Sequence, residues 1–134
     1  MSCYEYSRTH VRDLRNIAGF FRLSAPPGFW KIDEQSLTAL YNGIGPEKWS
    51  HRFRRMTTWL LRYFESDALI HDYEYSLPVK SYKHFTIANL RFALNSVRLS
   101  FRSMNFFRAV KVSVLGLLLA VLCQCFGWHG YKDV

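Results

Sequence analysis

Cysteine is almost absent from the body of this 134-residue chain, because its three cysteines stand at positions 3, 123 and 125. No disulfide can therefore bridge the residues between 4 and 122, which excludes a disulfide-stapled scaffold and favours a reducing compartment. The N-terminus carries no charged leader followed by an apolar core, so we expect no secretory signal. Internal repeats and low-complexity tracts are also missing, and the length suits one compact unit.

Side chains at metal-ligand spacing are equally scarce. Four of the histidines, at positions 10, 51, 84 and 129, stand alone, so structural or surface roles are expected for them. Cys123 and Cys125 would need two further ligands to form a zinc site, and apolar filling of a helix is the simpler interpretation.

Positive charge, in contrast, is abundant. The formal net charge is +8, which favours polyanionic partners, either nucleic acid or an anionic membrane. No recognised nucleic-acid motif accompanies the charge, so nucleic acid ranks last and is not expected as a partner. The cluster of Arg52, Arg54 and Arg55 is either a solvated helix face or a contact for lipid phosphates.

Apolar residues recur at helical spacing through most of the chain and predict an all-α fold of antiparallel helices. We expect three segments, namely an N-terminal amphipathic segment over 1–30, a helical domain over 31–107, and an apolar helix with a short tail over 108–134. Within them we predict a helix in 11–21 broken by the prolines that follow, a loop at 41–46, a helix at about 47–64, a helix capped by Ser66 or Asp67 and running to about Tyr75, and a long helix from about residue 84 leading toward the apolar tail, with Phe92, Leu99 and Phe106 in its apolar repeat.

The stretch 112–128 contains 17 residues without a charge, and Gln124 is its only strongly polar side chain. That length lies at the lower limit for a membrane-spanning helix. Arg108 and Lys111 precede it, and basic flanks favour the cytoplasmic side, so an anchored helix would leave the body on that side of a phospholipid membrane. Two alternatives stay open, a buried helix of a soluble core and a contact between copies of the chain.

Two short motifs carry the candidate chemistry. Gly43 and Gly45 allow the loop after Tyr41 to turn so that backbone carbonyls converge, which suits a hard cation such as Ca²⁺. A carboxylate must complete such a shell, and Asp72 is the candidate. Neighbouring residues of a helix project about 100° apart, so His71 can face a water while Asp72 faces the metal.

The same helix places Tyr75 one turn after His71, where its phenol can hold a hydrogen-bond network in register. The apolar run that precedes His71 is then the buried side of the helix, and the polar residues are expected to line a cleft. Tyr73 and Glu74 are assigned by default to solvent or lipid.

The ordered pair Tyr41-x-Gly43-x-Gly45 and His71-Asp72-x-x-Tyr75 resembles the phospholipase A2 superfamily, in particular its disulfide-free versions in parvovirus capsid proteins and small phage or prophage proteins. The similarity covers roughly residues 38–100. It implies Ca²⁺ bound by the carbonyls of Tyr41, Gly43 and Gly45 and by Asp72, with His71 as general base in hydrolysis of the sn-2 ester of glycerophospholipids.

One position departs from the pattern of that superfamily. A second aspartate orients its catalytic histidine, and here the matching residue is Asn89. An asparagine can accept a hydrogen bond from an imidazole but supplies no charge to stabilise the imidazolium, so activity is expected to be weak or lost. Two functions therefore stay open, a calcium-dependent hydrolase at a membrane and a membrane-anchored protein of the same fold that no longer catalyses. In both, His71 and Asn89 are expected to face each other across two antiparallel helices.

Overall fold

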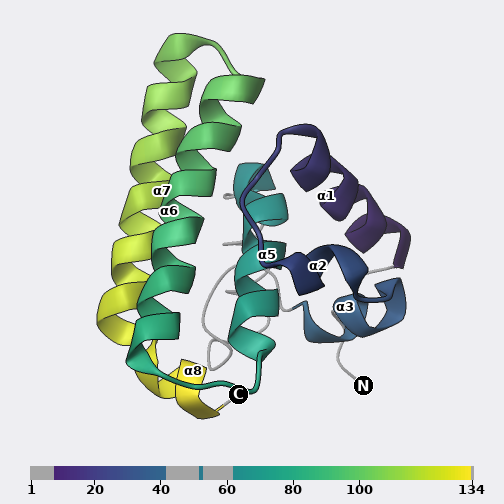
Figure 1. Cartoon of the computed structure of the whole chain (residues 1–134). Coiled ribbons are helices and arrows are strands. Elements are labelled where there is room, and N and C mark those ends of the chain that lie inside the picture. The colour runs from purple at the N-terminus through teal and green to yellow at the C-terminus, as the bar shows by residue number, and fades with distance from the viewer. Residues whose placement is uncertain (1–7, 42–51, 53–61, 134) are drawn as a thin grey trace.

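The computed structural model describes residues 8–41, 52 and 62–133, and within these ranges the regular structure is entirely helical (Figure 1). The predicted all-α class is confirmed for this part of the chain. The predicted loop at 41–46 and helix at 47–64 lie outside the described residues, apart from Tyr41, Arg52 and residues 62–64. The elements, in order, are α1 (Arg8–Phe20), α2 (Pro27–Lys31), α3 (Glu34–Leu40), the 3-10 helix η1 (Arg62–Phe64), α5 (Glu65–Ser76), α6 (Tyr82–Ser103), α7 (Phe106–Phe126) and α8 (Trp128–Asp133).

Helix α5 is the centre of the arrangement, because α1 and α3 pack on one side of it and α6 on the other (Figure 1). The amphipathic pattern of α1 directs Val11, Leu14 and Ala18 into the core, as its apolar spacing predicts. The tandem prolines do more than break this helix, since Pro27 stands in the first turn of α2, where a missing backbone N–H costs nothing.

The start of α5 differs from the predicted cap. The helix begins at Glu65, directly after η1, so Ser66 and Asp67 lie inside its first turn and not at its N-cap. Both side chains are buried, and the Ser96 hydroxyl on α6 donates to Asp67 Oδ2 at 2.8 Å. Burial raises the pKa of the Asp67 carboxyl well above its usual range. Asp67, a residue type typical of an N-cap, is therefore part of the contact between α5 and α6.

The predicted long helix is interrupted between α6 and α7. Met104 is extended, and the Asn105 side chain caps α7 by accepting from the Arg108 backbone N–H at 3.0 Å. The chain reverses there, so α7 returns antiparallel along α6 (Figure 1). Phe106, which the apolar repeat predicts to be buried, is 66% exposed at the start of α7.

Helices α6 and α7 approach closely because small residues line their contact. Buried positions of α7 include Ala109, Ser113 and Gly116. A methyl group added at Gly116 would lie 2.7 Å from Ser96 Oγ on α6 and 3.1 Å from the Phe64 ring. Only glycine permits this separation of the two helix axes.

The outward face of α7 is apolar and exposed. This helix is long and apolar enough to cross a membrane, yet only 28% of its apolar window is buried against the rest of the protein. A helix of a soluble core would be mostly covered, so the arrangement speaks against that alternative.

Replacement of Gly116 by alanine is expected to destabilise the protein by about 1–3 kcal/mol through overpacking against Ser96. The expected sign is opposite to that of helix propensity, which favours alanine over glycine by about 1 kcal/mol. Gly19→Ala is the matched control, because a methyl group there meets only Trp30, at an ordinary 3.7 Å. Urea unfolding followed by circular dichroism measures both. A Gly116→Ala variant as stable as wild type would contradict the close approach of α6 and α7.

Candidate functional site

His71 lies on α5 and faces α6, where its Nε2 is 2.8 Å from Oδ1 of Asn89. The two helices run antiparallel, so the sequence-based expectation that these side chains face each other is confirmed. His71 is 9% exposed, and its ring packs edge-on against the Phe92 ring with the centroids 5.3 Å apart. Within the described residues α6 covers the Nε2 side of this ring, and the cleft expected beside His71 stays a prediction.

Tyr75 completes the contact from one turn further along α5. Its hydroxyl donates to the same Asn89 Oδ1 at 2.7 Å, and its ring lies 4.1 Å from the His71 ring, centroid to centroid. The predicted position of Tyr75 beneath His71 is confirmed. One amide oxygen thus accepts from both side chains, which fixes their relative orientation. The catalytic roles assigned to the three residues stay predictions.

The nitrogen of the same amide has a partner on a third helix. Asn89 Nδ2 donates to Gln124 Oε1 on α7 at 2.8 Å, and Gln124 Nε2 donates to the hydroxyls of Tyr82 at 3.0 Å and Thr86 at 3.1 Å. Gln124 lies beyond the region of family resemblance, and its one sequence signal is that it interrupts an apolar run. The structure shows that this interruption belongs to the site.

Burial determines the protonation states of His71 and Tyr75. It lowers the pKa of His71 to about 4, against the smaller opposing effect of the Asn89 hydrogen bond, so the imidazole is neutral at neutral pH. Because Asn89 presents an oxygen, the single imidazole proton belongs on Nε2. Nδ1 makes no hydrogen bond to any of the described residues and keeps its lone pair. Burial also raises the pKa of the Tyr75 phenol, which therefore stays protonated as a donor.

Only some of the predicted calcium ligands belong to the part of the chain that the structure describes. Gly43 and Gly45 lie outside the described residues, whereas Tyr41 is buried at the end of α3, with its hydroxyl 3.4 Å from Glu65 Oε1. Asp72 is half-buried on α5 beside His71. Nowhere in the described ranges do three His, Cys, Asp or Glu side chains gather as a metal site.

Two buried carboxylates of α5 fit a metal less well than Asp72 does. Asp67 is fully buried with a raised pKa, and Glu74 is 8% exposed with Arg91 Nη1 2.9 Å from its Oε1. The default assignment of Glu74 and Tyr73 to solvent or lipid is therefore wrong, because both side chains pack into the core. Among these three carboxylates Asp72 is the one with partial solvent contact, which suits the donor set that the resemblance implies.

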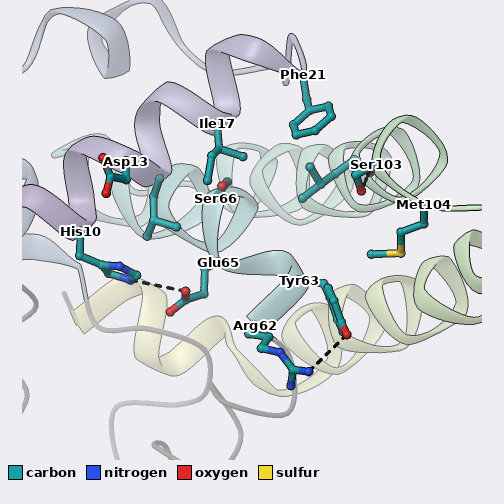
Figure 2. Close-up of a pocket in the computed structure, with 12 residues that line it drawn as sticks. His10, Asp13, Ile17, Phe21, Arg62, Tyr63, Glu65, Ser66, Ser103 and Met104 are labelled. Carbon is teal, nitrogen blue, oxygen red and sulfur yellow. Dashed lines mark hydrogen bonds and ion pairs between the residues drawn. The ribbon is translucent and has the colours of Figure 1, made fainter.

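A pocket of about 320 Å³ opens elsewhere, between α1, the start of α5 and the end of α6. Figure 2 shows His10 and Glu65 facing each other across it, with His10 Nε2 3.4 Å from Glu65 Oε2, and apolar side chains such as Ile17 and Phe21 along its wall. None of His71, Tyr75 and Asn89 lines this pocket. This pocket and the polar contact of His71 are thus separate features.

No protein-family model, curated protein or solved structure matches this chain. The arrangement of His71, Asn89, Tyr75 and Gln124 therefore has to be interpreted from its own geometry and from the motifs in the sequence.

The low pKa of His71 makes the stability of the fold pH-dependent in a definite direction. The unfolded state gains a proton near pH 6.5 and the folded state only near pH 4, so the contribution of His71 is complete above pH 6.5 and is lost as the pH falls toward 4. In the presence of chelator, we expect lowering the pH from 6.5 to 5 to cost wild type about 2 kcal/mol more than a His71→Gln variant.

Urea unfolding of both proteins at the two pH values measures this difference, and buried Asp67 and Glu74, present in both, cancel. Equal losses in the two proteins would show that His71 titrates normally. Asn89→Asp is expected to raise the pKa of His71 by supplying a negative charge, which an NMR titration of the imidazole would detect.

Proposed function

We propose that this protein is a calcium-dependent, phospholipase A2-like hydrolase of glycerophospholipid sn-2 esters that works while docked on a membrane. The observation that carries the proposal is the contact among His71, Asn89 and Tyr75 across two antiparallel helices. It leaves His71 neutral, with Nε2 bound and Nδ1 available, which is the state a general base needs.

In the proposed reaction His71 Nδ1 takes a proton from a water molecule as the water oxygen adds to the ester carbonyl carbon. The tetrahedral intermediate then breaks its bond to the glycerol oxygen, which receives the proton back from His71. The products are a free fatty acid and a lysophospholipid. Tyr75 and Asn89 hold the imidazole in position through both proton transfers.

Calcium bound by Asp72 and by the carbonyls of Tyr41, Gly43 and Gly45 would polarise the ester carbonyl and stabilise the oxyanion. The half-buried position of Asp72, next to His71 on α5, supports its place in this donor set.

Asn89 limits the rate in this proposal. A neutral amide leaves the protonated imidazole uncompensated in a buried setting, and the pKa of about 4 makes His71 a weak base. The same observation favours the second candidate, a membrane-bound protein of this fold without catalytic activity.

Docking on a membrane is supported by the surface of α6 and α7. Large apolar side chains are exposed on both helices, and the stretch from Tyr82 to Phe126 contains no Asp or Glu. Its charged residues are all basic, which suits anionic lipid headgroups. The exposed apolar residues include Ile87, Leu90, Leu94 and Phe101 on α6 and Phe107, Val114, Leu118, Val121, Leu122 and Phe126 on α7.

We place α7 along the membrane surface and not across it. Its Gln124 is hydrogen-bonded to Asn89 and Thr86 on α6, and α6 carries Arg91, Arg98 and Arg102, which do not enter a hydrocarbon core cheaply. The hairpin would therefore lie with its exposed apolar side chains among the acyl chains and its basic residues at the headgroups. The basic residues beside α7 favour the cytoplasmic face of the membrane.

Release of fatty acid from mixed zwitterionic and anionic vesicles tests the catalytic proposal. We expect calcium-dependent release by wild type, loss of about a hundredfold or more in His71→Gln, and a gain of about tenfold or more in Asn89→Asp, where a charge supports the imidazolium. Chelator provides the calcium control. If folded, vesicle-bound wild type and Asn89→Asp both release no more than His71→Gln, the non-catalytic candidate replaces this one.

Vesicle sedimentation tests the docking mode. Exchange of two exposed leucines of α6, Leu90→Glu with Leu94→Glu, is expected to weaken binding to anionic vesicles by about tenfold or more, since their burial in lipid is lost. Val79→Glu is the control, because Val79 is equally exposed but lies between α5 and α6. Undiminished binding of the double variant, with resistance to carbonate extraction, would instead indicate that α7 leaves α6 and spans the membrane.

A further inference from the structure

Gln124 is the side chain of α7 that is hydrogen-bonded to Asn89. It is half-buried, accepts from Asn89 Nδ2 through Oε1, and donates through Nε2 to two hydroxyls of α6. No hydrogen bond joins Gln124 to His71 within the described residues. Its effect on the imidazole must therefore pass through the amide of Asn89.

The Asn89 amide ends in one oxygen and one NH₂ group. The matching aspartate of the phospholipase A2 superfamily, which this chain resembles, ends in two equivalent oxygens. With Oδ1 toward α5, Asn89 accepts from both His71 Nε2 and the Tyr75 hydroxyl. Rotated by half a turn, it would present its NH₂ group to His71, whose Nε2 would then have to be the acceptor. The imidazole proton would move to Nδ1, and the lone pair that a base needs would be lost from that atom.

We infer that Gln124 is a positioning residue, which holds the Asn89 amide with its oxygen toward α5 and so fixes the His71 proton on Nε2. The inference depends on hydrogen bonds of the described residues alone. It deepens the proposed function, since it rests on His71 acting as a base through Nδ1.

Gln124 can hold the Asn89 amide in one orientation because that amide is buried. Asn89 is 3% exposed, so an NH₂ group without an acceptor would carry its desolvation penalty in full. Gln124 supplies that acceptor, and its Nε2 donates to the Tyr82 and Thr86 hydroxyls, so both ends of its amide are paired in this orientation. If the Gln124 amide is removed, the Asn89 amide can rotate so that its NH₂ group donates to His71 and Tyr75 on α5. Its oxygen then faces α7 without a donor, and a buried carbonyl without a partner is tolerated better than a buried N–H without one.

Nitrogen-15 NMR of the His71 imidazole at neutral pH, with chelator present, reads its tautomer directly. We expect the Nε2–H form in wild type and a shift of about fivefold or more toward Nδ1–H in Gln124→Met, which corresponds to the loss of one hydrogen bond. Ser113→Ala is the control on the same helix, because the Ser113 hydroxyl is also buried but has no partner among the described residues.

The same Gln124→Met substitution in an Asn89→Asp variant separates the positioning of the amide from a simple loss of packing. Asp at position 89 has two equivalent oxygens, so Asn89→Asp combined with Gln124→Met is expected to keep the Nε2–H form. An unchanged tautomer in Gln124→Met alone would overturn the inference. An equal shift in both backgrounds would also overturn it, since displacement of α6 would then be the cause.

If Gln124→Met does not fold, Tyr82→Phe with Thr86→Val removes the acceptors of Gln124 Nε2 and leaves Gln124 in place. A shift toward Nδ1–H is again expected, and its absence would overturn the inference. The tautomer is measured without substrate, so a protein that releases no fatty acid can still pass this test. Where release occurs, Gln124→Met is expected to lower kcat with KM unchanged.

Discussion

Burial of one amide group fixes how three helices lie against one another. Asn89 on α6 has two partners on α5 and one on α7, and its side chain is almost fully removed from water. Each of these groups would cost about 1–3 kcal/mol if left unpaired. A slide of either neighbouring helix by one turn would break several of the contacts at once. The site and the register of the fold are therefore set by the same few atoms.

The facing of His71 and Asn89 could be predicted because it needs only two helical periods and an antiparallel arrangement. The break after α6 could not, since the apolar repeat of Phe92, Leu99 and Phe106 continues through it at an unbroken heptad spacing. The Asn105 side chain caps the start of α7, and a lone asparagine is no distinct signal, since Asn89 and Asn95 lie inside α6.

Burial on α5 was predicted less well for a different reason. The helix is covered by α1 and α3 on one side and by α6 on the other, so Tyr73 and Glu74 are buried although they lie outside a single apolar face. A periodic pattern records one buried face and not a helix enclosed from two directions. The hydrogen bond of Gln124 to Asn89 could not be predicted either, because it depends on where α7 returns along α6.

Asp67 gives the fold a thermochemical signature. Its carboxyl is sealed between α5 and α6 with a raised pKa, whereas in the unfolded chain it ionises at its ordinary pKa. At a pH between those two pKa values, Asp67 is ionised in the unfolded chain and protonated in the folded chain. Folding therefore takes up a proton from solution. The heat of unfolding at such a pH then includes the ionisation heat of the buffer, so calorimetric enthalpies in phosphate and in an amine buffer differ although the structure is the same.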